Sequence, residues 1–119
     1  MRMSERCLRA ADYLAEHGHV RTIMRDPGTG AVCLAGALAM VSESGTDSAG
    51  MPVSRREVTE LHSALDFLDA QVPQVDPLYF GCLGPQHNCV TWNNLPTTSK
   101  EDVVLELKNG GVAARELGL

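Results

Sequence analysis

Cys33 is the residue whose setting most favours nucleophilic chemistry. It follows a Gly-rich stretch, residues 26–30, and begins a run of small and apolar residues that is typical of a helix. Because the first turn of a helix presents free N–H groups and a partial positive charge, it stabilises a thiolate. In this hypothesis Cys33 is the nucleophile of a hydrolase or transferase, His87 its base, and Asn93 or Asn94 the residue that orients the base. The other interpretation is that Cys33 is a small buried side chain beside Ala and Leu.

A second group of residues has the side chains that bind zinc. Cys82, His87 and Cys89 lie within eight residues, and Cys7 or Cys33 is able to supply a fourth ligand to a tetrahedral ion. The spacing is Cys-x4-His-x-Cys, which lacks the paired Cys-x2-Cys of common zinc sites. Buried thiols and a surface histidine explain the same residues. No cofactor is therefore expected, and zinc stays open as the alternative.

Trp92, Asn93 and Asn94 are the candidate binding residues. A single Trp between short polar residues is able to anchor an interface with a partner. In the other interpretation, which we favour for Trp92, the ring closes one end of the core. The two Asn side chains then cap local backbone in turns toward Pro96.

Helices are the elements that must position these residues. Aromatic residues make up only 4% of the chain, so Ala, Val, Leu and Met must build the core, which favours closely packed helices over a β-sandwich. Apolar residues at helical spacing, capping residues and helix breakers predict four helices. They run from Ser4 to Gly18, over 31–42, from Ser54 to Pro73, and from Thr98 into a region where Gly110-Gly111 breaks or kinks the last helix.

Three further segments complete the predicted fold. Residues 31–42 are largely apolar and carry no charge, so this helix belongs in the centre. Residues 19–25 alternate polar and apolar side chains, and we expect them to pair with an extended segment at 88–93. Residues 42–53 are predicted to form a mobile loop. The predicted fold is mainly α, with four helices around a central apolar helix and a short two-stranded β element, in a single globular domain of residues 1–119.

Charge and hydropathy argue against several classes of protein. The net charge is −5, and the 10 Lys and Arg residues form no cluster beyond Arg55-Arg56, so we expect no nucleic-acid binding. No apolar run is long enough to cross a bilayer, and no apolar segment of the kind found in signal peptides follows the first residues. We therefore expect a cytoplasmic protein with no membrane contact, whose four cysteines are reduced.

The order of three motifs resembles an uncharacterised family of short proteins from actinobacteria and their phages. The motifs are Cys-Leu-Ala-Gly-Ala-Leu at 33–38, Val-Thr-Trp-Asn-Asn at 90–94, and Pro-Thr-Thr at 96–98 before the last helix. That family tends to carry Cys-x-x-Gly-Ala-Leu and Trp-Asn-Asp/Asn. Asn94 stands where an Asp is common, which argues against a carboxylate acting there. The resemblance implies no known reaction, and it suggests a phage or actinobacterial origin and action in the host cytoplasm.

We interpret the chain as a small non-enzymatic protein-interaction module, encoded by a phage and acting on a host protein. The expected partner is a host or phage protein. A second copy of the chain is also a candidate, because the helix at 31–42 has more apolar surface than so short a chain readily covers. A cysteine-dependent enzyme that uses Cys33 and a zinc-stapled domain remain the alternatives.

Overall fold

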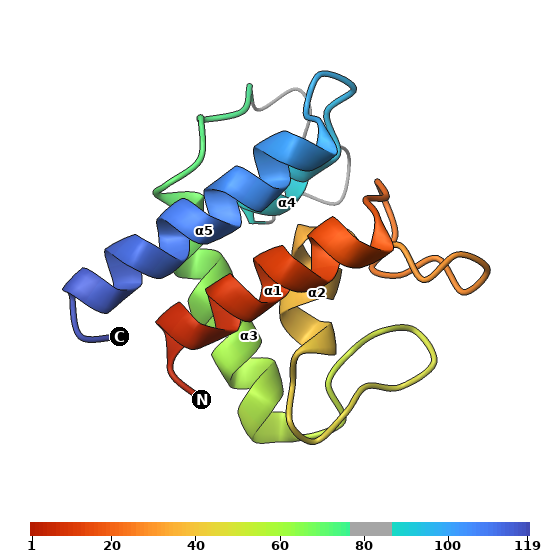
Figure 1. Ribbon diagram of the computed structural model, residues 1–119, viewed down its shortest axis with the longest axis horizontal. Coiled ribbons are helices and arrows are strands. Elements are labelled where there is room, and N and C mark those ends of the chain that lie inside the picture. The colour runs from red at the N-terminus through yellow and green to blue at the C-terminus, as the bar shows by residue number, and fades with distance from the viewer. Residues whose placement is uncertain (77–86) are drawn as a thin grey trace.

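The structure is a computed structural model that describes residues 1–76 and 87–119. Within these residues the fold consists of five α-helices and connecting loops (Figure 1). The helices are α1 (Met3–His17), α2 (Leu34–Met40), α3 (Arg55–Asp69), α4 (Asn88–Asn93) and α5 (Lys100–Glu116). None of the helices in the described part of the chain combines the length and the apolar character needed to span a bilayer.

The first and last helices form an antiparallel pair along one side of the molecule (Figure 1). Gly111 lies in this interface, where Leu8 of α1 packs over it, and the neighbouring Gly110 faces Leu68 of the helix α3. A Cβ atom on Gly111 would lie 2.7 Å from Cγ of Leu8, so only glycine permits the observed approach. The predicted break at these glycines is therefore wrong, because α5 runs through both of them and uses them for close packing.

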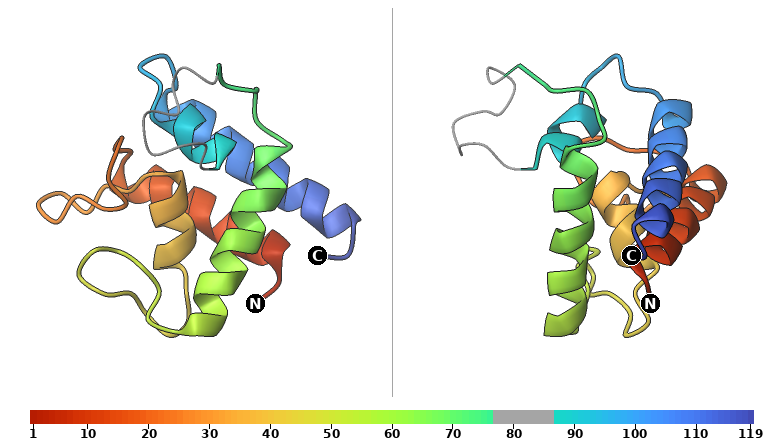
Figure 2. Two further views of the ribbon diagram at one scale, coloured as in Figure 1. Left: turned by 180° about the vertical axis from the view of Figure 1, so that it is seen from behind. Right: turned by 90° about the vertical axis from the view of Figure 1, so that its left-hand side faces the viewer.

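The short helix α2 occupies the centre of the fold. Figure 2 shows it between α3 and the pair formed by α1 and α5, and its residues 34–39 are all buried. The prediction of a central apolar helix is confirmed. The helix is shorter than predicted, because Cys33 has extended backbone and serves as the N-cap. The thiol sulfur of Cys33 accepts a hydrogen bond from the backbone N–H of Gly36, at 3.2 Å.

The predicted β element is wrong. Residues 88–93 form α4, and the described residues contain isolated bridges but no sheet. Residues 19–25 pair instead with the segment just after the Gly-rich turn, where Val32 makes one bridge to His19 and one to Arg25. The turn at residues 26–30 brings these two segments together over a short loop, which costs less conformational entropy than pairing with a distant strand.

A buried arginine joins three elements, and sequence reasoning did not foresee it. The side chain of Arg6 on α1 is 1% exposed. One of its terminal nitrogens donates to the carbonyl of Leu38 at 2.9 Å and to the hydroxyl of Ser42 at 3.0 Å. The other lies 3.5 Å from a carboxylate oxygen of Glu57 and 3.1 Å from one of Glu60. This cluster links α1, the end of α2 and the start of α3.

The carboxylate of Glu57 also organises the loop that precedes α3. It accepts hydrogen bonds from the backbone N–H groups of Glu43 and Ser44 and from the Ser44 hydroxyl. Ser54 caps the helix at the predicted start, but Glu57 binds this loop and Arg6, so the two residues form no reciprocal capping box. A reciprocal box does form at the start of α5, between Ser99 and Asp102.

Candidate functional site

A pocket of about 270 Å³ opens between the 22–24 loop, the start of α2, and the helices α3 and α4. Most of its walls are apolar, and its polar side chains include two histidines and one cysteine. The lining residues are Thr22, Ile23, Met24, Cys33, Ala35, Met51, Leu61, His62, Leu65, His87, Val90 and Asn94. The pocket therefore brings together residues that are far apart in the sequence.

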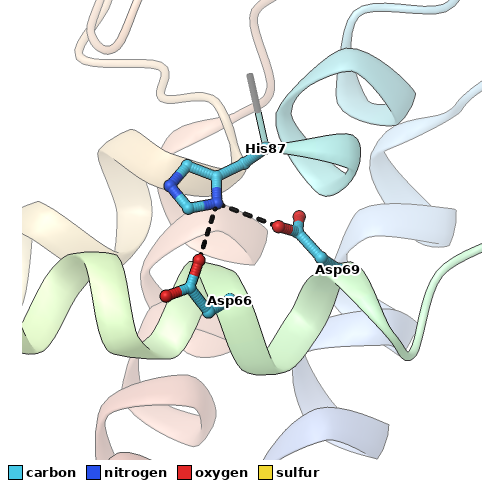
Figure 3. A group of neighbouring side chains, drawn as sticks. All are labelled: Asp66, Asp69 and His87. Atoms are coloured by element: carbon cyan, nitrogen blue, oxygen red, sulfur yellow. Dashed lines mark hydrogen bonds and ion pairs between the residues drawn. The ribbon is translucent and has the colours of Figure 1, made fainter. Parts of the chain in front are cut away.

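His87 contacts two carboxylates of α3 (Figure 3). Its Nδ1 atom lies 2.9 Å from an oxygen of Asp69 and 3.3 Å from an oxygen of Asp66. The two aspartates are three residues apart, so both project from the same face of the helix. The second oxygen of Asp69 accepts a hydrogen bond from the backbone N–H of Cys89 at 2.9 Å, which fixes this carboxylate at the start of α4.

The other ring nitrogen of His87 faces a second histidine. Its Nε2 atom lies 3.2 Å from Nδ1 of His62, which is four residues before Asp66 on α3. Both nitrogens of His87 are therefore engaged. If Nδ1 of a neutral His87 carries the proton and donates to Asp69, Nε2 accepts from His62. If Nε2 carries it, Nδ1 is free to bind a cation between the two carboxylates.

Cys33 and His87, which the sequence suggested as a catalytic pair, line the same pocket. Cys33 is 6% exposed. Burial raises the pKa of the Cys33 thiol and outweighs the lowering effect of the N–H groups of Gly36 and Ala35 at the start of α2. The thiol form, which is the weaker nucleophile, is thus favoured at neutral pH.

Asn93 is buried and holds distant backbone in place. Its side-chain oxygen accepts hydrogen bonds from the N–H of Leu34 at 3.0 Å and from His19 at 2.8 Å. Its amide nitrogen donates to the carbonyl of Val20 at 3.3 Å. His87 is oriented by Asp69 and Asp66, whereas Asn93 connects α4 to the loop at 19–20 and to the first residue of α2.

Trp92 and Asn94 also have structural contacts. Trp92 is buried in the core, in agreement with the interpretation that we favoured. Asn94 accepts a hydrogen bond from the N–H of Thr22 at 2.8 Å, and Thr22 has a φ of 69°, which is rare for a β-branched residue. The two asparagine side chains therefore bind the backbone of the 20–22 loop and of α2. The sequence had instead suggested that they cap nearby turns toward Pro96.

Of the cysteines proposed as zinc ligands, Cys7 and Cys89 are buried in the core. Cys89 is fully buried, and its thiol donates to the carbonyl of Leu65 at 3.5 Å. Burial first, and the Asp69 carboxylate second, raise the pKa of this thiol. Cys7 lies in the core, where burial raises its pKa to about 11 against the opposing charge of Arg6. Cys82 lies outside the described residues.

Sequence reasoning missed the partners that α3 supplies to His87. No role was predicted for Asp66, Asp69 or His62. The available signal was the spacing His-x3-Asp-x2-Asp, which puts the three polar side chains on one face of a helix. Three potential ligand atoms, from Asp66, Asp69 and His87, all lie within 4.8 Å of one another.

Comparison with known proteins places the chain in a family. No curated protein matches it, and no solved structure does. Residues 2–109 match a family described as a family of unknown function, DUF6197. The match covers the helices α1 to α4 and most of α5, including all residues around the pocket. The chain therefore belongs to DUF6197, a family whose function is unknown.

Proposed function

We propose that the protein is a small interaction module without catalytic activity, which takes up an apolar side chain of a partner protein in the pocket beside His87. The pocket is the observation that carries this proposal. Its volume of about 270 Å³ lies just below the range of about 300–1,000 Å³ that is typical of sites for drug-sized ligands. A pocket of this size suits one anchoring side chain better than a nucleotide-sized cofactor.

The walls of the pocket favour an apolar anchor. Met24 and Met51 contribute flexible thioether side chains, which adapt to different shapes of side chain. Leu61 and Leu65 supply fixed apolar surface from α3. Ile23 lines the pocket and is 49% exposed, so a partner that covers it buries additional apolar area.

The partner that we propose is a host or phage protein in the bacterial cytoplasm, and this part of the proposal rests on the resemblance described above. The net charge of −5 favours encounter with a basic surface. A second copy of the chain is the other candidate. The oligomeric state in solution decides between them, because a self-associated protein elutes at twice the mass of the monomer.

The test compares two substitutions of exposed apolar residues. Ile23→Asp places a charge at the pocket, whereas Leu105→Asp changes a residue of α5, which is 56% exposed and does not line the pocket. We expect a protein captured from an actinobacterial lysate by the wild-type chain to bind the Leu105→Asp variant equally well and the Ile23→Asp variant at least tenfold more weakly. Equal binding of all three forms by the purified partner would refute the pocket as the site.

The second candidate function is a cysteine-dependent hydrolase or transferase. The observation in its favour is that Cys33, His62 and His87 line one pocket. The thiol pKa, which burial raises, argues against it. Iodoacetamide labelling at neutral pH, followed by peptide mass analysis, separates the two functions. Slow labelling of Cys33 supports the interaction module, and rapid labelling that is lost in His87→Gln supports the enzyme.

A further inference from the structure

We propose that one carboxylate oxygen each from Asp66 and Asp69, together with Nδ1 of His87, forms a binding site for a divalent transition-metal ion such as Zn²⁺. This site differs from the cysteine-based one that the sequence suggested, because both oxygen ligands come from α3. It also differs from the interaction proposed above, since it requires no partner protein and its two carboxylates do not line the pocket, while His87 belongs to both sites.

The distances from Nδ1 of His87 to the two carboxylate oxygens suit a shared ion, and all three atoms lie within 4.8 Å of one another. Nδ1 of His87 lies 2.9 Å from Asp69 and 3.3 Å from Asp66. Zinc binds nitrogen and oxygen ligands at about 2.0–2.2 Å, and ligands at right or tetrahedral angles around such an ion are about 3.0–3.4 Å apart. An ion therefore fits between these atoms with only small side-chain movements.

The local charge favours a cation. Among the described residues, the ion pairs of Asp66 and Asp69 are made with His87 alone, without a lysine or arginine. Two carboxylates that face one imidazole leave a net negative charge even when the histidine is protonated. A divalent ion compensates that charge, and a mixed set of imidazole and carboxylate ligands selects a metal such as zinc over magnesium.

Neighbouring groups already hold two of the ligands in position. The backbone N–H of Cys89 binds the second oxygen of Asp69 at 2.9 Å. Nδ1 of His62 lies 3.2 Å from Nε2 of His87 and is placed to accept a hydrogen bond from a protonated Nε2, which leaves the lone pair of His87 Nδ1 directed at the ion. This arrangement is the one that histidine ligands of metals usually have, with the distal nitrogen bonded to another group.

The site is accessible and incomplete. The side chain of Asp66 is 73% exposed, so an ion can enter from solvent without unfolding of the chain. Three protein ligands leave at least one position of a tetrahedral ion for water or for a ligand from another molecule. We therefore expect a weaker and more exchangeable site than a structural zinc site with four protein ligands.

The first experiment measures zinc binding directly by titration calorimetry, after treatment with a chelator. We expect one Zn²⁺ per chain, with affinity reduced at least tenfold in Asp66→Asn and in His87→Gln. Asp12→Asn changes an exposed carboxylate on α1 and serves as the matched control, for which no change is expected. Asp66 is the preferred aspartate for substitution, because Asp69 also binds the backbone of α4.

The second experiment identifies the nitrogen that zinc binds. Two-bond nitrogen–proton NMR spectra of the imidazoles report which nitrogen carries the proton. Zinc should leave Nδ1 of His87 unprotonated and Nε2 protonated, and His62→Ala should weaken zinc binding about tenfold, in the range found for groups that orient histidine ligands. Failure of zinc to bind, or equal binding by wild type and Asp66→Asn, would overturn the proposal.

A further variant separates the aspartate site from the cysteine site. Cys82→Ser should leave zinc affinity unchanged, and loss of binding in that variant would contradict the proposal in favour of the Cys-x4-His-x-Cys set. These measurements use the isolated chain and the metal alone. They therefore remain informative if no partner protein binds the pocket, and the binding assay with Ile23→Asp remains informative if no zinc binds.

Discussion

The two ends of α3 carry the same arrangement of acidic residues in opposite surroundings. Near its start, Glu57 and Glu60 face the guanidinium of Arg6, whose side chain is 1% exposed. Near its end, Asp66 and Asp69 face the imidazole of His87 at the edge of a pocket. In both pairs the acidic residues are three positions apart. The difference lies in the partner, which is a permanent cation at one end and, at the other, a histidine, a residue type whose charge depends on pH and which is a common metal ligand.

The spacing of two acidic residues on a helix gives only the possibility of a paired site. Burial and the choice of cation decide what the pair does. At the start of α3, backbone N–H groups and Arg6 satisfy the Glu57 carboxylate, so the cluster fastens three elements together. At the end of α3, the exposed Asp66 and the pocket beside His87 leave room for a ligand.

The largest effect that we expect comes from Arg6→Ala. This change leaves the buried Glu57 carboxylate without its cation and should lower the free energy of unfolding by about 3–5 kcal/mol. Urea unfolding followed by circular dichroism measures it. Arg9→Ala is the matched control on α1, because its ion pair with Glu5 is exposed and should contribute no more than about 1 kcal/mol. Equal losses in both variants would remove the contrast between buried and exposed pairs.

The next effect is a loss of stability at low pH, which we expect from Glu57 at the start of α3. Burial alone would raise the pKa of Glu57, but hydrogen bonds from Ser44 and Glu43, and the charge of Arg6, together lower it to about 2 from 4.5. Because the folded state favours the ionised form, this stabilisation is complete above pH 4.5 and is lost as the pH falls toward 2.

Glu57→Gln tests this dependence. The variant should be less stable than wild type at neutral pH, and the difference between the two should shrink as the pH falls from 4.5 toward 2. Thermal unfolding at a series of pH values measures the difference. A constant gap across that interval would show that Glu57 is not the group responsible.

A smaller effect is expected at the other end of the helix. His87→Ala removes the partly exposed contacts of an imidazole with two carboxylates and should change the free energy of unfolding by no more than about 1 kcal/mol in metal-free buffer. Chemical unfolding with a chelator present measures it. A loss comparable to that of Arg6→Ala would mean that the two ends of α3 are equally structural.

The smallest effect is expected from Arg56→Ala. Arg56 is exposed and pairs with Glu60 four residues later, a type of pair that contributes about 0.3–0.5 kcal/mol. Glu60 keeps its bond to the buried Arg6 in this variant. A loss well above 1 kcal/mol in urea unfolding would show that the network at the start of α3 extends to the surface.

Much of the helical framework could be predicted from the sequence. Local residue types in the sequence were enough to predict three features. These are the end of α1 at Gly18, the cap of α3 at Ser54 and the central position of α2. The segment that became α4 misled us, because Val90, Thr91 and Trp92 favour strands. Tertiary contacts override that preference: Asn93 binds the backbone of α2, and Trp92 is buried in the core.

The candidate site was only partly accessible to sequence reasoning. His87 was identified from its residue type and its position near two cysteines, and the structure places it in the lining of the same pocket as Cys33. The aspartates that contact His87 lie 18 and 21 residues before it in the chain, and only the fold brings them there. The burial of Arg6 could not be predicted for a similar reason. A charged residue on a helix is expected to be exposed unless its partners are known.

The stretch from Cys33 to Gly36 gives a final consequence. Gly36 donates its N–H to the thiol of Cys33, and a Cβ at position 36 would lie 2.7 Å from the carbonyl carbon of Met24. The two residues together hold the loop against the central helix. Cys33 accepts the hydrogen bond, and Gly36, which has no side chain, lets the backbone of Met24 approach closely. A side chain at position 36 is excluded by steric fit, and Cys33 has a structural role as a hydrogen-bond acceptor that requires no reactivity of its thiol.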